Sequence, residues 1–203
     1  MYCKVFKPIL DIIFSFLFVI GVLPLFLPVL LALTVVNQGS PLFFQKRTGK
    51  NGKPFYLIKL KTMSDKRNTD GQLLPDSARL HRFGRFLRKT SLDEIPQLIN
   101  ILKGDMSFIG PRPLLHEYMP LYSSFQRKRH LLKPGISGWA QVNGRNTVTW
   151  EEKFKLDVFY VENVSIALDT RILLLTVKKV VMSEGVNTND GDMMPFFQGT
   201  KSL

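Results

Sequence analysis

A long uncharged run near the N-terminus constrains this chain more than any other feature. Residues 12–36 contain no charged side chain over 25 residues, which is long enough for a helix to cross a hydrocarbon core of about 30 Å. Two prolines, Pro24 and Pro28, lie near the middle of the run. Because proline lacks the N–H that the helical backbone ladder uses, a bend is expected there. The chemistry of the remaining chain is therefore expected at a membrane face, and its substrate is expected to be a lipid.

Three arrangements of the run are open. A cleaved signal peptide is disfavoured because residues 30–40 lack a clear small-residue cleavage site and Asp11 interrupts the basic region. A straight spanning helix is the default for such a composition. A re-entrant hairpin agrees better with the charges, because basic residues mark the cytoplasmic side of a membrane and flank the run on both sides. These are Lys4, Lys7, Lys46, Arg47, Lys50 and Lys53.

The flanking charges therefore predict a monotopic, re-entrant membrane helix over residues 1–38, kinked at Pro24. One compact domain over residues 39–203 is predicted to lie on the cytoplasmic face. The lone Cys3 excludes a disulfide within the chain and agrees with a reducing compartment.

The positive charge of the chain is unevenly distributed. The net charge is +12, and residues 37–135 contain 19 basic and 7 acidic side chains, so the whole excess directly follows the apolar run. Such a patch attracts anionic lipid head groups, by about 1 kcal/mol per basic residue near the surface. Nucleic acid is the other common polyanion, but the adjacent apolar run favours lipids and phosphorylated substrates. We therefore expect no nucleic-acid partner.

Local patterns predict an α+β fold that is mostly helical. Residues 41–47 and 54–61 flank a turn that contains Asn51-Gly52, which is typical of a β-hairpin. Residues 64–77 and 133–149 are rich in polar residues, glycine or proline and are predicted to be loops. Several helices are predicted around the domain, and three of them combine apolar faces with basic residues, which suits either a membrane interface or an ordinary core. The predicted helices cover residues 78–90, 92–103, 117–132, 150–162 and 170–183.

The segment Ser91-Leu92-Asp93-Glu94 is the best candidate for chemistry. It matches a capping box, with Ser at the cap and Glu three residues on, and the acids then merely complement the helix dipole. The same helix start would also keep a carboxylate ionised. An ionised carboxylate can attack phosphorus or bind Mg²⁺ together with substrate phosphates. The pattern leaves both interpretations open.

Cations surround this acid pair in the sequence. Arg88 lies upstream, and Arg112 lies downstream between two prolines that stiffen its backbone for phosphate binding. Arg145 stands on a glycine-containing segment with Asp157 as a candidate partner, and Lys59 lies near the end of the hairpin. An acid pair among cations beside a membrane predicts phosphoryl transfer to or from a lipid phosphate.

An ordered set of motifs resembles the monotopic phosphoglycosyl transferases of bacteria. The resemblance is greatest to the short type that acts on UDP-diacetylbacillosamine in the campylobacter protein-glycosylation pathway. The set covers nearly the whole chain and is highly specific as a set. One departure is that the family breaks its membrane helix at a Ser-Pro pair, where this chain has Leu23-Pro24. The matching motifs are Lys59-Leu60-Lys61-Thr62-Met63, Ser91-Leu92-Asp93-Glu94, Leu102-Lys103-Gly104-Asp105-Met106-Ser107, Gly110-Pro111-Arg112-Pro113-Leu114-Leu115 and Pro134–Asn146.

The resemblance implies a two-step, ping-pong mechanism. Asp93 would attack the β-phosphate of a UDP-sugar, release UMP and form a phosphoglycosyl-aspartate, from which undecaprenyl phosphate would take the sugar phosphate. Asp93 would also bind the required Mg²⁺, and Glu94 would assist by positioning or proton handling. The donor would be UDP-diacetylbacillosamine or another UDP-N-acetylhexosamine. Roles in substrate binding are implied for Lys59, Arg88, Arg112, Arg145 and Asp157.

The resemblance also implies where the protein acts. It would lie on the cytoplasmic face of the bacterial inner membrane, contact anionic lipids and catalyse the first membrane step of glycoconjugate or polysaccharide assembly. Homodimerisation stays open. One alternative is a membrane glycosyltransferase that releases UDP. The other is a non-enzymatic protein that binds anionic lipids and would tolerate the loss of both acids.

Overall fold

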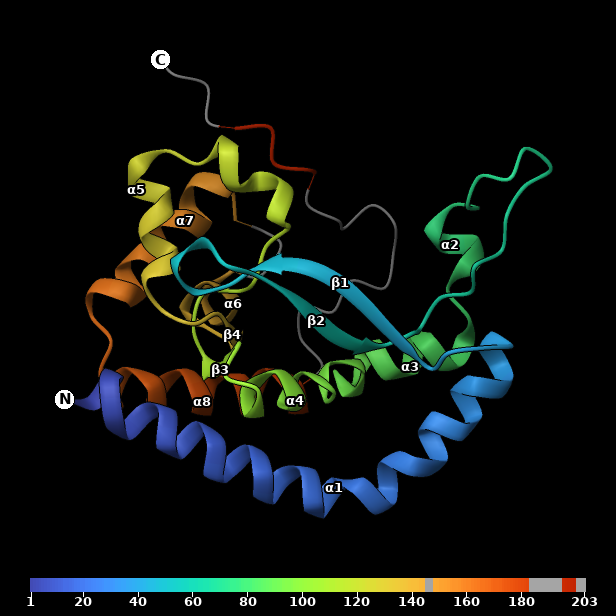
Figure 1. Cartoon of the computed structure of the whole chain (residues 1–203), viewed down its shortest axis with the longest axis horizontal. Helices are drawn as coiled ribbons and strands as arrows, with labels where there is room; N and C mark the ends of the chain where they lie inside the picture. The colour runs from blue at the N-terminus through green and yellow to red at the C-terminus, as the bar shows by residue number, and fades with distance from the viewer. Residues whose placement is uncertain (145–147, 183–194, 200–203) are drawn as a thin grey trace.

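The described structure places two small sheets among many helices, which confirms the predicted α+β class. The computed structural model describes residues 1–144, 148–182 and 195–199. One sheet is antiparallel and the other is parallel, with two strands each (Figure 1). In chain order the elements are η1 (Tyr2–Phe6), α1 (Lys7–Asn37), β1 (Leu42–Thr48), η2 (Lys50–Gly52), β2 (Pro54–Leu60), α2 (Asp76–Arg79), α3 (Arg82–Lys89), η3 (Leu92–Glu94), α4 (Gln97–Leu102), β3 (Ser107–Ile109), η4 (His116–Leu121), α5 (Ser124–Arg127), η5 (Lys128–Leu131), β4 (Gly135–Ser137), α6 (Trp139–Asn143), α7 (Trp150–Glu162) and α8 (Ile166–Val181).

Helix α1 contains the apolar run and is bent. Together with η1 it forms a helix over Tyr2–Asn37 that is long and apolar enough to cross a membrane. Pro24 and Pro28 lie inside α1, and each removes a backbone donor from the helical ladder. Figure 1 shows that α1 bends near its middle, so that a first arm lies under the domain and a second arm rises beside it.

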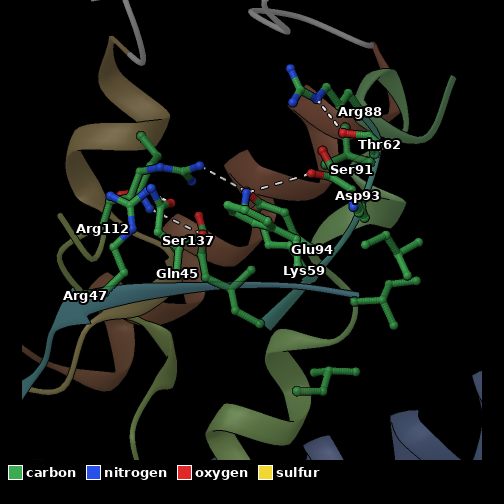
Figure 2. Close-up of a pocket in the computed structure, with 18 of the residues that line it drawn as sticks. Gln45, Arg47, Lys59, Thr62, Arg88, Ser91, Asp93, Glu94, Arg112 and Ser137 are labelled. Atoms are coloured by element: carbon green, nitrogen blue, oxygen red, sulfur yellow. Dashed lines mark hydrogen bonds and ion pairs between the residues drawn. The ribbon is translucent and has the colours of Figure 1, made fainter. Parts of the chain in front are cut away.

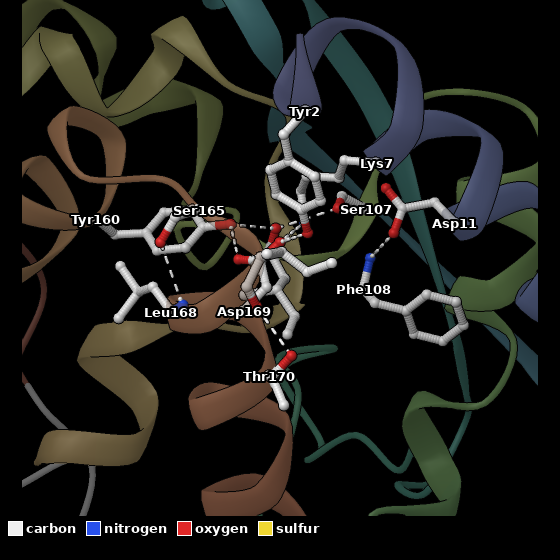
Figure 3. A network of polar contacts seen from close by, with 12 residues as sticks. Tyr2, Lys7, Asp11, Ser107, Phe108, Tyr160, Ser165, Leu168, Asp169 and Thr170 are labelled. Atoms are coloured by element: carbon white, nitrogen blue, oxygen red, sulfur yellow. Dashed lines mark hydrogen bonds and ion pairs between the residues drawn. The ribbon is translucent and has the colours of Figure 1, made fainter.

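A buried polar network fixes the first arm of α1 to α8 (Figure 3). Lys7 Nζ lies 2.7 Å from Asp169 Oδ2, and the Tyr2 hydroxyl donates to the same oxygen at 2.6 Å. Tyr160 donates its hydroxyl to the other oxygen, Asp169 Oδ1, at 2.7 Å. One turn after Lys7, the Asp11 carboxylate accepts a hydrogen bond from the backbone N–H of Phe108 in β3 at 3.2 Å. Because residues four apart share one helix face, these polar side chains form the side of α1 that faces the domain.

The C-terminal end of α1 contacts the same domain. Leu33 is fully buried and belongs to an apolar cluster with Leu60 of β2 and Leu87 of α3. Asn37 Nδ2 donates to the carbonyl oxygen of Lys61 at 2.8 Å. Most large apolar side chains between the two contact regions are exposed. Both ends of the apolar helix therefore lie against one domain.

The predicted hairpin is confirmed. Strands β1 and β2 pair antiparallel from Leu42 opposite Leu60 to Thr48 opposite Pro54. In the connection, the φ angles of Asn51 and Gly52 are 55° and 76°. This left-handed conformation is the one that an Asn-Gly turn favours.

The loop predicted over residues 133–149 is wrong in part, because the segment contains β4 and α6. Strand β4 lies parallel to β3. A Cβ atom on Gly135 would come within 2.1 Å of the backbone nitrogen of Gly110. Glycine is thus required for the close approach of the two backbones. A three-residue strand is too short to show the alternation that would reveal it in the sequence.

The helix predictions differ in accuracy. Helix α7 confirms the prediction over residues 150–162, and α8 begins before the predicted residue 170 because the Ser165 side chain caps it. The single helix predicted over 78–90 is divided into α2 and α3, with the His81 side chain capping α3.

The helix predicted over residues 117–132 is wrong as a single element. It consists of η4, α5 and η5. Pro120 lacks a backbone donor inside η4, and Ser123 starts a new helix with its own capping box.

Helix α8 exposes a large apolar surface. Figure 1 shows it along the same side of the molecule as the first arm of α1. Lys178 and Lys179 lie in its last turn, a combination that suits the predicted membrane interface. The large exposed apolar residues of α8 are Ile166, Leu173, Leu174, Val177, Val180 and Val181.

Candidate active site

A cleft of about 830 Å³ contains the acid pair and most of the predicted cations. Lys59 comes from β2, Arg88 from α3, and Asp93 and Glu94 from η3, while Arg112 follows β3. Figure 2 shows Lys59 and Arg112 directed toward Glu94, with Arg88 on the far side of Asp93. The structure therefore brings together predicted site residues that are widely separated in the sequence.

The acid pair lies on a single 3₁₀ turn, so the predicted capping box is wrong. The helix predicted over residues 92–103 is confirmed only in its second part, as α4. Ser91 has a left-handed φ of 57°, and its side chain makes no cap hydrogen bond. The Glu94 carboxylate, which a capping box would need, contacts two cations instead. Helix α4 begins only after Pro96.

Glu94 forms the centre of an ion-pair network. Its Oε1 lies 2.7 Å from Lys59 Nζ and 3.0 Å from Arg112 Nη2. Burial alone would raise the pKa of Glu94, but Lys59 and Arg112 together hold it well below its usual range. Glu94 therefore stays ionised and orients both cations toward the cleft.

Asp93 lies in a different environment although it is the adjacent residue. It is 8% exposed, and its carboxylate accepts no hydrogen bond from the described residues. Its nearest cation is Lys59, whose Nζ lies 3.8 Å from Oδ2. Burial, reinforced by Glu94, raises the pKa of Asp93 against the effect of Lys59. The expectation that the helix start lowers the pKa of this acid is thus corrected, because burial outweighs the favourable charges around it.

Arg88 lies beside the acid pair, on the side opposite Arg112 (Figure 2). Its Nε donates to Thr62 Oγ1 at 2.9 Å. On the same helix, a Cβ atom on Gly84 would come within 2.1 Å of the Thr62 carbonyl oxygen. This close packing of α3 against the segment after β2 fixes the position of Arg88.

Asp157 lines the cleft, but its charge is paired inside the protein. It is 1% exposed, and its Oδ2 accepts hydrogen bonds from Arg129 Nη2 at 2.7 Å and Nε at 3.1 Å. Arg129 also donates to the carbonyl oxygen of Arg112 at 2.7 Å. Asp157 thus supports Arg129, which in turn holds the backbone of Arg112. Arg145, the partner expected from the sequence, lies outside the described residues.

Arg47 and Lys153 also line the cleft and were not among the predicted site residues. Arg47 Nη1 donates to the Pro113 carbonyl at 3.3 Å. Burial, and next the positive charge of Arg112, lowers the pKa of Arg47 to about 10. Lys153 on α7 is buried. Its burial, and next the positive charge of Arg112, lowers its pKa to about 8. The signal for Arg47 is strand alternation, which places Gln45 and Arg47 on one face of β1.

The family model described as "Bacterial sugar transferase" matches residues 2–183. The chain belongs to the bacterial sugar transferase family. The apolar helix and the acid pair both lie within the matched region.

Three members of the sugar transferase family show how far the likeness extends. The "Uncharacterized sugar transferase EpsL" of Bacillus subtilis is 54% identical over 171 residues, which cover 84% of this chain and 85% of EpsL. The UDP-glucose:undecaprenyl-phosphate glucose-1-phosphate transferase of Xanthomonas campestris is 37% identical over 191 residues, covering 89% of this chain and 40% of that protein. The UDP-N-acetylgalactosamine-undecaprenyl-phosphate N-acetylgalactosaminephosphotransferase of Aeromonas hydrophila is 36% identical over 175 residues, covering 80% and 41%.

This chain therefore spans less than half the length of the latter two sugar transferases. Their names concern glucose and N-acetylgalactosamine. The expected closeness to the campylobacter type stays a prediction.

The donor atoms of this site fit the Mg²⁺ that the resemblance implies. Mg²⁺ prefers oxygen ligands and is usually bound by one or two carboxylates together with substrate phosphates. Asp93 offers such an oxygen, whereas Glu94 is already bound by two cations. Within the described ranges, no group of three or more His, Cys, Asp or Glu residues could hold a metal. The residues thus fit an ion whose coordination is completed by substrate phosphates.

Proposed function

We propose that this sugar transferase moves a sugar 1-phosphate from a UDP-sugar to undecaprenyl phosphate and releases UMP. The proposal rests chiefly on Asp93, a buried carboxylate that accepts no hydrogen bond from the described residues and faces a cleft lined by cations. The names of the Xanthomonas and Aeromonas relatives support this class of reaction. The volume of the cleft also suits a nucleotide sugar.

In the first step, a carboxylate oxygen of Asp93 attacks the β-phosphorus of the UDP-sugar. The new bond joins this oxygen to phosphorus, while the bond from phosphorus to the bridging oxygen breaks and its electron pair leaves with UMP. Lys59 and Arg112 face the site where negative charge collects on the phosphoryl oxygens. Mg²⁺, when bound, would supply further charge neutralisation there.

In the second step, an oxygen of undecaprenyl phosphate attacks the same phosphorus. The bond between phosphorus and Asp93 breaks, which restores the carboxylate and leaves the sugar phosphate on the lipid. Departure of UMP frees part of the cleft before the lipid phosphate reacts. A stepwise route therefore lets one nucleophile serve both substrates.

We assign Glu94 to positioning rather than to proton handling. A carboxylate whose pKa lies well below its usual range is a poor proton donor and a weak base near neutral pH. Its bonds to Lys59 and Arg112 instead hold two cations at fixed places beside Asp93.

We also propose that α1 is re-entrant and that the protein is monotopic on the cytoplasmic face of the inner membrane. Both ends of α1 contact one domain, through Lys7–Asp169 and Asn37–Lys61. A straight spanning helix would carry its ends to opposite sides of the bilayer. Cys3 is the one cysteine in the chain. An impermeant thiol reagent should therefore label it in inside-out vesicles and not in right-side-out vesicles, and labelling in both orientations would refute this topology.

The reaction is tested by identifying the nucleotide that the purified protein releases. The assay contains Mg²⁺, undecaprenyl phosphate and, in turn, UDP-glucose, UDP-N-acetylgalactosamine and UDP-diacetylbacillosamine. Wild type and the exposed-loop control Asp70→Asn should release UMP from at least one donor, whereas Asp93→Asn should release none. Release of UDP would indicate a glycosyltransferase. Vesicle binding without release from any donor would indicate a lipid-binding protein.

A further inference from the structure

The cleft has one end near the membrane helix and one end remote from it. At the near end, Arg88 follows Leu87, which packs in a cluster with Leu33 of α1. At the remote end, the backbone N–H of Thr48 donates to the carbonyl oxygen of Leu114 at 3.1 Å. Leu114 belongs to an aromatic-rich cluster that includes no described residue of α1. Arg47, next to Thr48, therefore lies at the remote end.

Figure 2 shows the basic side chains on two sides of the acid pair. Arg47, Gln45 and Arg112 lie on one side of Glu94, and Arg88 lies on the other. The reaction has one substrate anchored in the bilayer and one dissolved in the cytosol. The lipid phosphate approaches from the membrane, whereas the nucleotide can enter from the remote end.

Arg47 is held in place by neutral groups. Its Nη2 donates to Gln45 Oε1 at 2.5 Å and its Nη1 to the Pro113 carbonyl at 3.3 Å. Among the described residues it has no carboxylate within ion-pair distance, and its buried Nε has no partner. Arg112, in contrast, contacts Glu94. Arg47 thus faces the cleft with a charge that the described side chains do not neutralise.

We propose that Arg47 binds the α-phosphate of the UDP-sugar, the phosphate that leaves in UMP, while the lipid phosphate binds toward Arg88. This assignment rests on the proposed function and divides its cleft between the two substrates. A guanidinium that is already oriented loses little freedom when it binds a phosphate. Gln45 strengthens the subsite in two ways. Its carboxamide oxygen orients Arg47, and its amide nitrogen, which donates no hydrogen bond to a described residue, can donate one to the phosphate.

The test compares Arg47→Met and Arg47→Lys with Lys46→Met, a change of an exposed lysine on the same strand. Binding of UMP to the purified protein is measured by calorimetry in the presence of Mg²⁺, without turnover. Arg47→Met should weaken UMP binding about 10- to 100-fold, as expected for one charge-assisted contact. Arg47→Lys should weaken it less, and Lys46→Met should leave it unchanged.

Steady-state kinetics distinguish binding of the nucleotide phosphate from binding of the lipid phosphate. In Arg47→Met, kcat/KM for the UDP-sugar should fall by a similar factor, whereas kcat/KM for undecaprenyl phosphate should stay within twofold of wild type. Equal losses for both substrates, or unchanged UMP binding in Arg47→Met, would overturn the assignment. UMP binding is measured without catalysis, so it tests Arg47 even if wild type releases no UMP and the proposed function fails.

Discussion

The Arg129–Asp157 pair offers the sharpest test of how the site is supported. Replacing Arg129 by Met leaves the Asp157 carboxylate, 1% exposed, without the guanidinium that donates two hydrogen bonds to its Oδ2. Removing one partner of a buried pair typically destabilises a protein by 3–5 kcal/mol. Burial already raises the pKa of Asp157, so uptake of a proton limits the loss. We therefore expect the free energy of unfolding to fall by about 3 kcal/mol, which corresponds to a decrease in Tm of about 6–12 °C.

A second variant separates stability from function. In Arg129→Met/Asp157→Leu neither charge remains, so most of the lost stability should return. The hydrogen bond from Arg129 to the Arg112 carbonyl is absent in both variants. kcat/KM for the UDP-sugar should therefore stay reduced about tenfold in the double variant, as expected for one hydrogen bond.

Thermal unfolding in detergent micelles and UMP release measure the two effects. A loss below about 1 kcal/mol in Arg129→Met would show that the pair is not the buried support described above. Full recovery of kcat/KM in the double variant would show that Arg129 does not position Arg112.

Acid should destabilise the fold through His130. Burial, and next the positive charge of Arg129, lowers the pKa of His130 to about 3. Below pH 6.5 the unfolded imidazole binds a proton that the folded one does not, so the free energy of unfolding should fall by about 2 kcal/mol between pH 7 and pH 5; the same fall in His130→Gln would contradict this. Asp169→Asn leaves the buried ammonium of Lys7 without its anion and should lower Tm in micelles by several degrees. Lys7→Met/Asp169→Asn removes that unpaired ammonium while the Asn carboxamide still offers an acceptor near the Tyr2 and Tyr160 hydroxyls, and should recover most of the loss; equal Tm values for wild type and both variants would show that the pair contributes nothing. Gly84→Ala forces a Cβ to within 2.1 Å of a backbone carbonyl and should lower both stability and UMP release, whereas Gly21→Ala, with nothing within 4 Å, should change neither; indistinguishable effects would refute the packing argument.

Features with a local signal could be predicted from the sequence. The apolar run over residues 12–36 gave the long helix, because its length and lack of charge are visible in one window. Asn51-Gly52 gave the hairpin, because the turn chemistry is contained in two residues. The helix over 150–162 has its own capping box and was also found. Where proline or short strands divide a segment, as over 117–132, periodicity overestimated helix length.

The site was predictable in composition but not in its contacts. Asp93 and Glu94 were identified as an acid pair, yet their environments differ because Lys59, 35 residues earlier in the chain, contacts Glu94 most closely. Arg129 pairs with Asp157 across 28 residues, and no spacing rule joins positions so far apart. Arg47 was counted only as a flanking charge. Tertiary contacts therefore decide which charges are neutralised and which face the cleft.

The central claim is that Asp93 becomes covalently linked to the sugar phosphate. The most direct measurement mixes the protein with Mg²⁺ and its best UDP-sugar, omits the lipid, quenches rapidly and determines the mass of the intact protein. The account predicts a sugar-phosphate adduct on Asp93, one equivalent of UMP, loss of the adduct when undecaprenyl phosphate is added, and no adduct in Asp93→Asn. UMP release that occurs only with the lipid present and without any adduct, or an adduct that persists in Asp93→Asn, would contradict it.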